Sequence, residues 1–275
     1  MIAPPQHIVP RAALTVAGSD PTGGAGLQAD LKTFAALGVY GTSAITAVTV
    51  QNTLGVTDVH PLPTDLVAAQ IESIAADIAL HATKIGMLAT SAIVEVVAAT
   101  IAELDLPRVV VDPVMLATSG RRLLDEDGVR SLRSDLLPRA LVVTPNIPEA
   151  EVLSGWRIRT GDDVREAARR IHALGPAVVV TGGHAGGAEV VDVLFDGRDF
   201  VEFRAPRIET THTHGSGCTF ASALAAHLAR GCTLADATRR AHDYVAGAIR
   251  HAIAIGAGAG PLGHFWHLRP TDASG

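Results

Sequence analysis

The chain has 275 residues, and its 22 basic and 28 acidic side chains give a formal net charge of −6 at neutral pH. This acidic balance disfavours nucleic acids and membrane surfaces, so we expect neither as a partner. The hydrophobic fraction of 48% suffices for a sizeable core and excludes a disordered chain. The lysines are Lys32 and Lys84, and neither follows a glycine, which excludes the Gly-Lys-Ser/Thr phosphate loop.

The ends of the chain give no sign of export. Residues 1–11 lack the basic and apolar blocks of a signal peptide, and we expect them and residues 269–275 to be flexible extensions. Two cysteines, Cys218 and Cys232, are too few to hold an exported chain of this length together. We therefore expect a cytoplasmic protein with a single domain over residues 1–275.

Short apolar runs alternate with helical patterns along the chain. The first run, Ala12–Ala17, ends at a glycine, and a helix is predicted over Gly26–Leu37. A strand is predicted over Ser43–Val50. Later apolar runs without polar alternation predict strands buried on both faces: Thr83–Met87, Val109–Val111, Leu141–Thr144 and Ala177–Thr181. The other predicted helices are Thr64–Asp77, Ala92–Leu104, Gly128–Leu137, Asp162–Leu174, Gly217–Arg230 and Leu234–Ile253.

A hairpin is predicted where Val190–Phe195 and Phe200–Phe203 flank an Asp-Gly pair. The alternation of strands and helices predicts an α/β fold with a doubly wound, mostly parallel central sheet and helices on both faces. Ligands of such folds bind beyond the carboxyl ends of the strands, so the residues that follow the apolar runs are the candidates for function.

A glycine-rich segment, residues 18–26, joins the first strand to the first helix. Glycines there let backbone N–H groups approach an anion or a flat ring closely. The spacing differs from the dinucleotide fingerprint Gly-x-Gly-x-x-Gly, and a tight strand-to-helix turn is the alternative interpretation.

Carboxylates follow two of the later strands. Asn146 and Glu149 are three residues apart after Leu141–Thr144, which suits a Mg²⁺ ion carried by phosphates. The alternative is a capping box, in which Asn146 caps a helix and Glu149 bonds back to it. Asp112 follows Val109–Val111 and is a candidate Mg²⁺ ligand or base, or merely the cap of a turn.

The segment His214–Thr219 precedes a long alanine-rich helix. Gly215, Ser216 and Gly217 at a helix start can form an anion hole from backbone N–H groups and the helix dipole. Cys218 then lies in the first turn, where we expect its thiolate to be favoured. The alternative is a buried structural cysteine. His212 and His214 have no further histidine or cysteine at ligand spacing, so we expect no metal there.

Taken together, these segments resemble the hydroxymethylpyrimidine/phosphomethylpyrimidine kinases of thiamin biosynthesis, which belong to the ribokinase-like superfamily. The resemblance covers roughly residues 12–268. The segments that carry it, in order, are Ala17–Phe34, Thr46–Thr53, Lys84–Leu88, Asp112–Met115, Thr144–Glu149, Gly182–His184 and His214–Thr219.

The resemblance implies a homodimeric kinase that uses ATP and Mg²⁺. Its acceptors would be 4-amino-5-hydroxymethyl-2-methylpyrimidine and then the monophosphate of that pyrimidine. The residues that match the family's pyrimidine pocket are Gly18, Asp30, Gln51, Met87 and Val114. The catalytic match comprises Gly215, Ser216, Gly217 and Cys218. The nucleotide match comprises Asn146, Thr181, Gly183 and Gly217, and Asp112 and Glu149 match the metal site, the latter through water.

Several positions lead to hypotheses about this chain in particular. The family often has lysine where Thr118 and Thr181 stand, and aspartate where Arg121 stands. Arg121 is therefore a candidate replacement for a phosphate-binding lysine. Most of the wider superfamily has aspartate in place of Cys218, so we hypothesise that a thiol of lowered pKa accepts the proton of the first acceptor's alcohol. The second acceptor is a phosphate that is already ionised and needs no base.

Three other functions remain open from the sequence. Pyridoxal kinase activity is the nearest alternative, although Gln51 and Met87 favour the aminopyrimidine. A non-catalytic pyrimidine-binding regulator would be expected to lack the metal and anion-hole residues that this chain has. A nicotinamide-dependent oxidoreductase rests on glycine spacing alone. Whether the chain performs both phosphorylations is not decided by its sequence.

Overall fold

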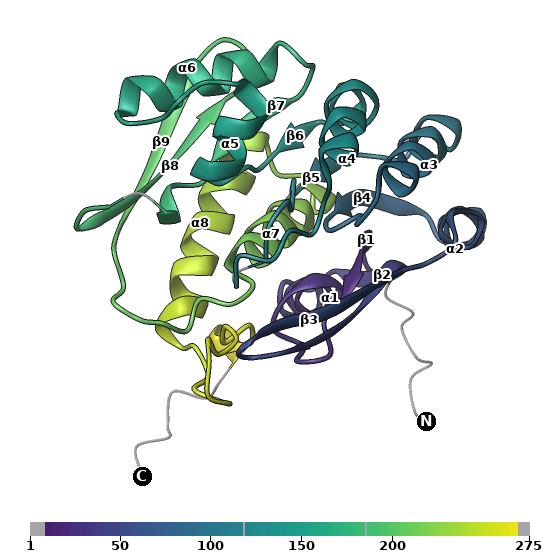
Figure 1. Ribbon diagram of the computed structural model, residues 1–275, viewed down its shortest axis with the longest axis horizontal. Coiled ribbons are helices and arrows are strands. Elements are labelled where there is room, and N and C mark those ends of the chain that lie inside the picture. The colour runs from purple at the N-terminus through teal and green to yellow at the C-terminus, as the bar shows by residue number, and fades with distance from the viewer. Residues whose placement is uncertain (1–8, 118, 185, 269–275) are drawn as a thin grey trace, which may run out of the picture.

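The computed structural model describes residues 9–117, 119–184 and 186–268. Thr118 and most of the two predicted flexible extensions therefore lie outside the described residues. Over this part of the chain the strands join one sheet in the order β3-β2-β1-β4-β5-β6-β7-β8-β9 (Figure 1). The strands are β1 (Ala12–Ser19), β2 (Tyr40–Asn52), β3 (Gly55–Pro61), β4 (Leu80–Ile85), β5 (Val109–Val111), β6 (Val142–Val143), β7 (Ala177–Val180), β8 (Glu189–Phe195) and β9 (Phe200–Pro206).

The middle of the sheet is parallel and its edges are antiparallel. Strands β2, β1, β4, β5, β6 and β7 run parallel to one another. Strand β3 pairs antiparallel with β2 at one edge, and the hairpin β8–β9 extends β7 at the other. The predicted doubly wound, mostly parallel sheet is confirmed.

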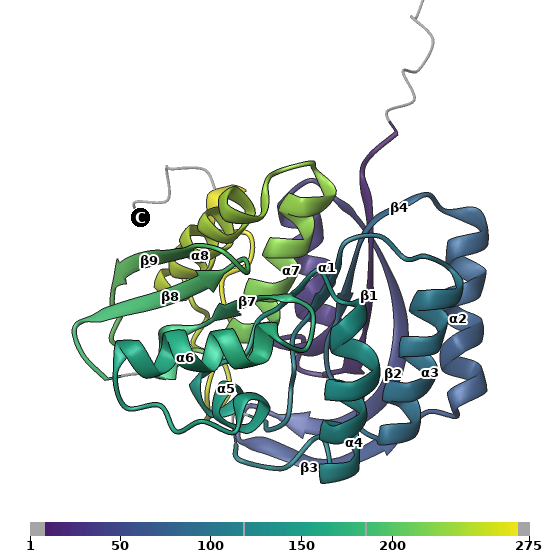
Figure 2. The same cartoon turned by 90° about the horizontal axis from the view of Figure 1, so that it is seen from above.

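Helices cover both faces of the sheet (Figure 2). One face carries α1 (Gly26–Ala36), α7 (Ser216–Ala229) and α8 (Leu234–Arg250), whose apolar side chains share one core cluster. The other face carries α2 (Thr64–Asp77), α3 (Ser91–Glu103), α4 (Glu126–Ser131), α5 (Ile147–Ser154) and α6 (Gly161–His172). Strand β5 is apolar throughout because both of its faces are buried. Val110 packs into the cluster beneath α1, α7 and α8, and Val109 and Val111 pack into the cluster on the other face.

Two elements differ from the prediction. Strand β3 was not predicted, because Asp58 and His60 interrupt it and it lies at the exposed sheet edge, where no apolar alternation is needed. The helix predicted over Gly128–Leu137 is shorter: α4 passes into a π turn over Leu132–Leu136 and a 3₁₀ turn over Leu137–Arg139. Pro138 lies in that last turn and cannot donate the hydrogen bond of a continuing α-helix.

No helix among the described residues is long and apolar enough to cross a membrane. The functional interest lies at the carboxyl ends of the parallel strands, where the loops after β1, β5, β6 and β7 meet the start of α7.

Candidate active site

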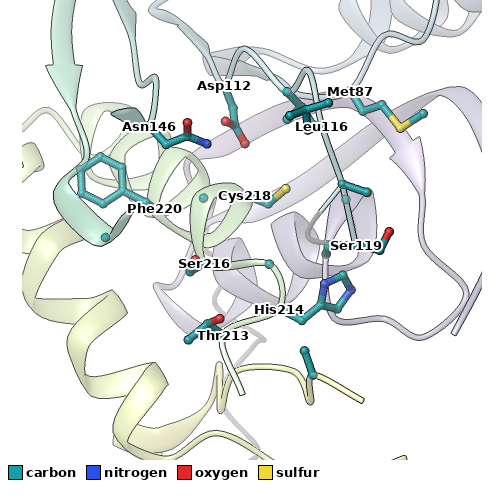
Figure 3. A pocket seen from close by; sticks show the side chains of 18 of the residues that line it. Met87, Asp112, Leu116, Ser119, Asn146, Thr213, His214, Ser216, Cys218 and Phe220 are labelled. Atoms are coloured by element: carbon teal, nitrogen blue, oxygen red, sulfur yellow. The ribbon is translucent and has the colours of Figure 1, made fainter. Parts of the chain in front are cut away.

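A cavity of about 840 Å³ lies at this end of the sheet (Figure 3). It brings together residues from loops that are far apart in the sequence, as the resemblance implied. The site residues from the sequence analysis that line it are Gly18, Gln51, Met87, Asp112, Val114, Asn146, Glu149, Thr181, Gly183, Gly215, Ser216, Gly217 and Cys218.

Glycines allow the two loops on either side of the cavity to interlock. Gly215 caps the start of α7 with φ 82°, and a Cβ atom there would lie 1.9 Å from the carbonyl oxygen of Gly24. Gly26 has φ 54°, and its Cβ would lie 2.4 Å from the carbonyl oxygen of Gly18. The glycine-rich segment is therefore a tight turn, as the alternative interpretation had it, and this turn also forms one wall of the cavity.

One end of the cavity is formed by β1, β2 and the loop after β4. Gly18 lies against Met87, whose Sδ atom would be 3.0 Å from a Cβ at position 18. Thr46 on β2 donates to the carbonyl of Met87 at 2.6 Å, which fixes the backbone of this wall. Gln51, from the end of β2, supplies an amide at this end of the cavity.

Asp30 is not among the residues that line the cavity, which differs from its expected place in the pyrimidine pocket. Its carboxylate is fully buried on α1 and accepts hydrogen bonds from Thr15 at 2.6 Å and Ser222 at 2.5 Å. Lys84, also fully buried, lies 2.9 and 3.0 Å from its two oxygens. Asp30 is thus the centre of a polar cluster beneath the site. Burial acts to lower the pKa of Lys84, but the charges of Asp30, Cys218 and Asp112 and the hydrogen bond to Asp30 together outweigh it and hold that pKa above its ordinary value.

Asp112 and Glu149 form an acidic pair on the side of the cavity near α5 and the start of α7. Burial raises the pKa of Asp112 to about 6, with Lys84 and Cys218 opposing the shift. Burial and the nearby Asp112 charge raise the pKa of Glu149 to about 8. The Oδ2 atom of Asp112 is buried without a hydrogen-bond partner. Two carboxyl groups that resist ionisation, one with an unpaired oxygen, are suited to a bound cation.

Asn146 and Glu149 also form the capping box that was the alternative interpretation. The Asn146 side chain accepts from the Glu149 N–H at 3.0 Å, and Glu149 accepts from the Asn146 N–H at 3.0 Å. Capping α5 and facing a cation are compatible, because each carboxylate oxygen has more than one lone pair. Among the described residues no group of three or more His, Cys, Asp or Glu could hold a metal by itself. A cation here would need phosphate oxygens and water to complete its shell.

Cys218 stands in the first turn of α7, as predicted, but its pKa is opposite to the expectation. Burial raises the pKa of the thiol to about 12; Lys84 opposes this rise, and the carboxylates of Asp112 and Asp30 add to it. The expectation of a favoured thiolate is therefore wrong. The start of the helix lowers the pKa of the thiol less than burial and the nearby negative charges raise it.

Arg121, the candidate replacement for a phosphate-binding lysine, lies outside the cavity lining. Arg121 donates to the carbonyls of Val56 and Thr57 on β3 and lies 3.7 Å from Asp58. It does not line the cavity, whereas the next residue, Arg122, does. Arg207, after β9, is a second cation of the cavity wall that the sequence analysis missed; it donates to the carbonyls of Gly183 and Gly187. No motif marked either arginine, because their loops carry no glycine pattern.

Comparison with known proteins gives a consistent result. The family model described as phosphomethylpyrimidine kinase matches residues 20–263. The hydroxymethylpyrimidine/phosphomethylpyrimidine kinase of Bacillus subtilis is 47% identical over 255 residues, which cover 92% of this chain and 94% of that protein. The thiamine biosynthesis bifunctional protein ThiED of Geobacter sulfurreducens is 49% identical over 252 residues, and the match spans 91% of this chain but only about half (51%) of that longer protein.

The fold agrees with that of a solved kinase. An ADP complex of Bacillus subtilis pyridoxal kinase superposes with a TM-score of 0.87 at 41% identity, and the match covers 94% of this chain and 99% of that one. The matched family model spans most of the chain and includes all of the cavity-lining residues except Gly18 and Ser19. The chain therefore belongs to the phosphomethylpyrimidine kinase family.

Proposed function

We propose that this protein transfers the γ-phosphoryl group of ATP to the hydroxymethyl oxygen of 4-amino-5-hydroxymethyl-2-methylpyrimidine, and then a second one to the resulting monophosphate. The observation that supports this most directly is the arrangement of the cavity. One end has Gly18, Gln51 and Met87, which suit a flat polar ring, and the other has the acidic pair and the start of α7. The family membership and the ADP-bound relative are consistent with this acceptor and donor.

Phosphoryl transfer requires the site mainly to position the reactants and to stabilise the charge of the transferring group. In the first turn of α7, the N–H groups of Gly217 and Cys218 have no helical carbonyl partner and can donate to the phosphoryl group in transfer. Ser216 lines the same turn, but its N–H is donated to Thr213 at 3.2 Å. Asp112 faces this turn, since both of its oxygens would lie 3.9 Å from a Cβ at Gly217.

Asp112 and Glu149 fit a Mg²⁺ ion, with Asn146 beside them, and Thr181 and Gly183 fit the nucleotide on the side of β7. When bound, Mg²⁺ would neutralise charge on the phosphates. Asn146 is connected to the nucleotide side of the cavity, because it pairs with Thr181 as an extension of β6 and β7.

Magnesium should stabilise the protein more strongly at higher pH. A carboxyl with a pKa raised to about 8 holds a proton at neutral pH, and a cation must displace it. Without cation, stability falls as pH rises from the ordinary value of 4.5 towards about 8, because the unfolded chain releases that proton earlier. We expect the rise in Tm caused by MgCl₂ with ADP to be larger above pH 8 than below pH 6. Differential scanning fluorimetry measures it.

The matched variants are Glu149→Gln, which should lose most of this pH dependence, and Glu103→Gln, an exposed glutamate at the end of α3, which should keep it. A Mg²⁺-dependent Tm shift that is the same at both pH values, or that survives in Glu149→Gln, would contradict the assignment of the cation to this pair.

Removing the Cys218 thiol should affect both transfers similarly. A thiol with a pKa of about 12 is protonated at neutral pH and cannot serve as a resting base. We expect Cys218→Ala to lower kcat less than about tenfold with either acceptor, well below the roughly 10²–10⁴-fold effect of a lost general base. Cys232→Ala, outside the cavity, is the control. A large loss confined to the hydroxymethyl acceptor would restore the base hypothesis.

The direct test of the function is a phosphate-transfer assay with the hydroxymethylpyrimidine and its monophosphate, with product identification by mass spectrometry. It also decides whether one or both phosphorylations occur. Pyridoxal kinase activity is the second candidate, because the superposed pyridoxal kinase shares 41% identity. Comparing kcat/KM for pyridoxal and for the pyrimidine alcohol decides between them.

We also propose a homodimer, as the resemblance implied, and a cytoplasmic protein with one domain in each chain. The apolar side chains of Tyr40, Val48, Val50 and Leu54, exposed along β2 and its turn, are consistent with a surface that a second copy covers. Sedimentation velocity measures the oligomeric state.

A further inference from the structure

Gln51 lies in a chain of polar side chains along the wall of the cavity. Its amide nitrogen position is 3.1 Å from Nε2 of His214, and its oxygen position is 3.4 Å from the hydroxyl of Thr49. Nε2 of His214 is also 2.9 Å from a carboxylate oxygen of Asp20. The Thr49 hydroxyl lies 2.9 Å from the carbonyl oxygen of Ser19. All of these residues line the cavity.

The positions of the hydrogens in this row of side chains can be assigned by elimination. Asp20 accepts from the N–H groups of Thr22 and Ala25 at 2.8 Å each. Burial acts to raise the pKa of Asp20, but the hydrogen bonds from His214 and Thr22 outweigh it, so the pKa is lowered and the carboxylate only accepts. The bond between Asp20 and His214 therefore needs a hydrogen on Nε2. That nitrogen then has no lone pair left for an amide N–H.

The two ends of an amide have the same shape, and the hydrogen-bond partners decide which end is which. With Nε2–H on His214, the Gln51 oxygen must face the imidazole. The Thr49 hydroxyl has one hydrogen, which the Ser19 carbonyl takes, so this hydroxyl accepts from the Gln51 nitrogen. In this arrangement the Nε2–H of His214 lies between two acceptors, the Asp20 carboxylate and the Gln51 oxygen, and the Gln51 N–H points to the Thr49 hydroxyl. With the amide turned around, the Gln51 N–H faces the Nε2–H and the Gln51 oxygen faces a hydroxyl whose hydrogen is already donated, so neither contact is a hydrogen bond.

We propose that Asp20 and His214 hold the Gln51 amide in one orientation, with Oε1 on the His214 side and Nε2 on the Thr49 side, and thereby select a ring that carries an amino group beside a ring nitrogen. This rests on the proposed function for the nature of the substrate. A fixed acceptor beside a fixed donor matches such an edge, as the same amide matches the N6 and N7 atoms of adenine. In a ring with an ionised hydroxyl in place of the amine, the hydroxyl oxygen would face Oε1 of Gln51, and two acceptors cannot form a hydrogen bond.

The imidazole itself is packed in place. It projects from the loop ahead of α7 (Figure 3), where His214 forms a β-bridge with Pro261. On the other side it lies against Gly24, where a Cβ would come within 2.6 Å of Cδ2. His214 is therefore a positioning residue that acts through Gln51.

The test is binding, measured by calorimetry without ATP, for the aminopyrimidine alcohol and for pyridoxal. His214→Ala should lower the preference for the pyrimidine, taken as the ratio of the two Kd values, by about tenfold, the effect of one misdirected hydrogen bond. His214→Gln keeps an N–H donor and should restore most of the preference. His212→Gln is the matched control, since His212 is in the same loop, bonds Gly260 and lies outside the cavity lining.

An unchanged ratio in His214→Ala, with the pyrimidine still bound, overturns this inference alone. An equal loss of affinity for both rings that His214→Gln does not repair also overturns it, because it shows a merely structural role. If the unmodified protein does not bind the aminopyrimidine, the proposed function fails, and this inference fails with it.

Discussion

Replacing Gly215 with alanine is expected to lower kcat/KM for both acceptors by at least about a hundredfold, the scale seen when a charge-stabilising donor is displaced. The residue has φ 82°, a left-handed conformation that alanine adopts only with strain. The added Cβ would also lie 1.9 Å from the carbonyl oxygen of Gly24, far inside contact distance. The loop must therefore move, and the N–H groups at the start of α7 move with it.

The comparison that isolates this effect is Gly231→Ala. Gly231 follows the other end of α7 with φ 88°, but a Cβ there meets nothing within 4 Å. It shares the backbone strain, about 1 kcal/mol, and lacks the collision. Initial rates with both acceptors, together with Tm, separate the two. If both variants lose activity to the same extent, strain alone explains the loss and the interlocked loops are not needed for catalysis.

The sequence predicted the parallel sheet and the cavity loops well for a physical reason. A strand buried on both faces must be apolar throughout, so runs such as Val109–Val111 are visible without any partner. Strand β3 has no such requirement, because it is an exposed edge strand with polar side chains on both faces. Its pairing with β2 is a tertiary property that local pattern does not encode.

The site residues were predicted less evenly, because a motif shows which residues come together and not how deeply they are buried. Asp30 and Cys218 both belong to matching segments, yet Asp30 is sealed beneath the site and Cys218 has a raised pKa. Both outcomes depend on the charges packed around Lys84, which come from α1, β4, α7 and the loop after β5. How deeply a carboxylate is buried depends on how all of these elements pack together, and the sequence of one segment does not determine it.

Lys84→Met should be strongly destabilising, by about 3–5 kcal/mol, because it leaves a buried carboxylate without its counter-charge. The Lys84 ammonium and the Asp30 carboxylate have side-chain exposures of 0% each, so water cannot take the place of the lost partner. Thr15 and Ser222 still donate to Asp30, but two hydroxyl groups do not neutralise it. Urea denaturation monitored by circular dichroism measures the change in the free energy of unfolding.

The double variant Lys84→Met/Asp30→Asn should recover much of this loss, because the buried charge is then gone from both sides. The matched surface pair is Arg204 and Glu189, 3.2 Å apart and each more than half exposed, where Arg204→Met should cost no more than about 1 kcal/mol. A double variant no more stable than Lys84→Met would show that the lysine stabilises the fold through its packing. Recovery in the double variant would show that the lysine stabilises the fold mainly by neutralising the buried Asp30 charge.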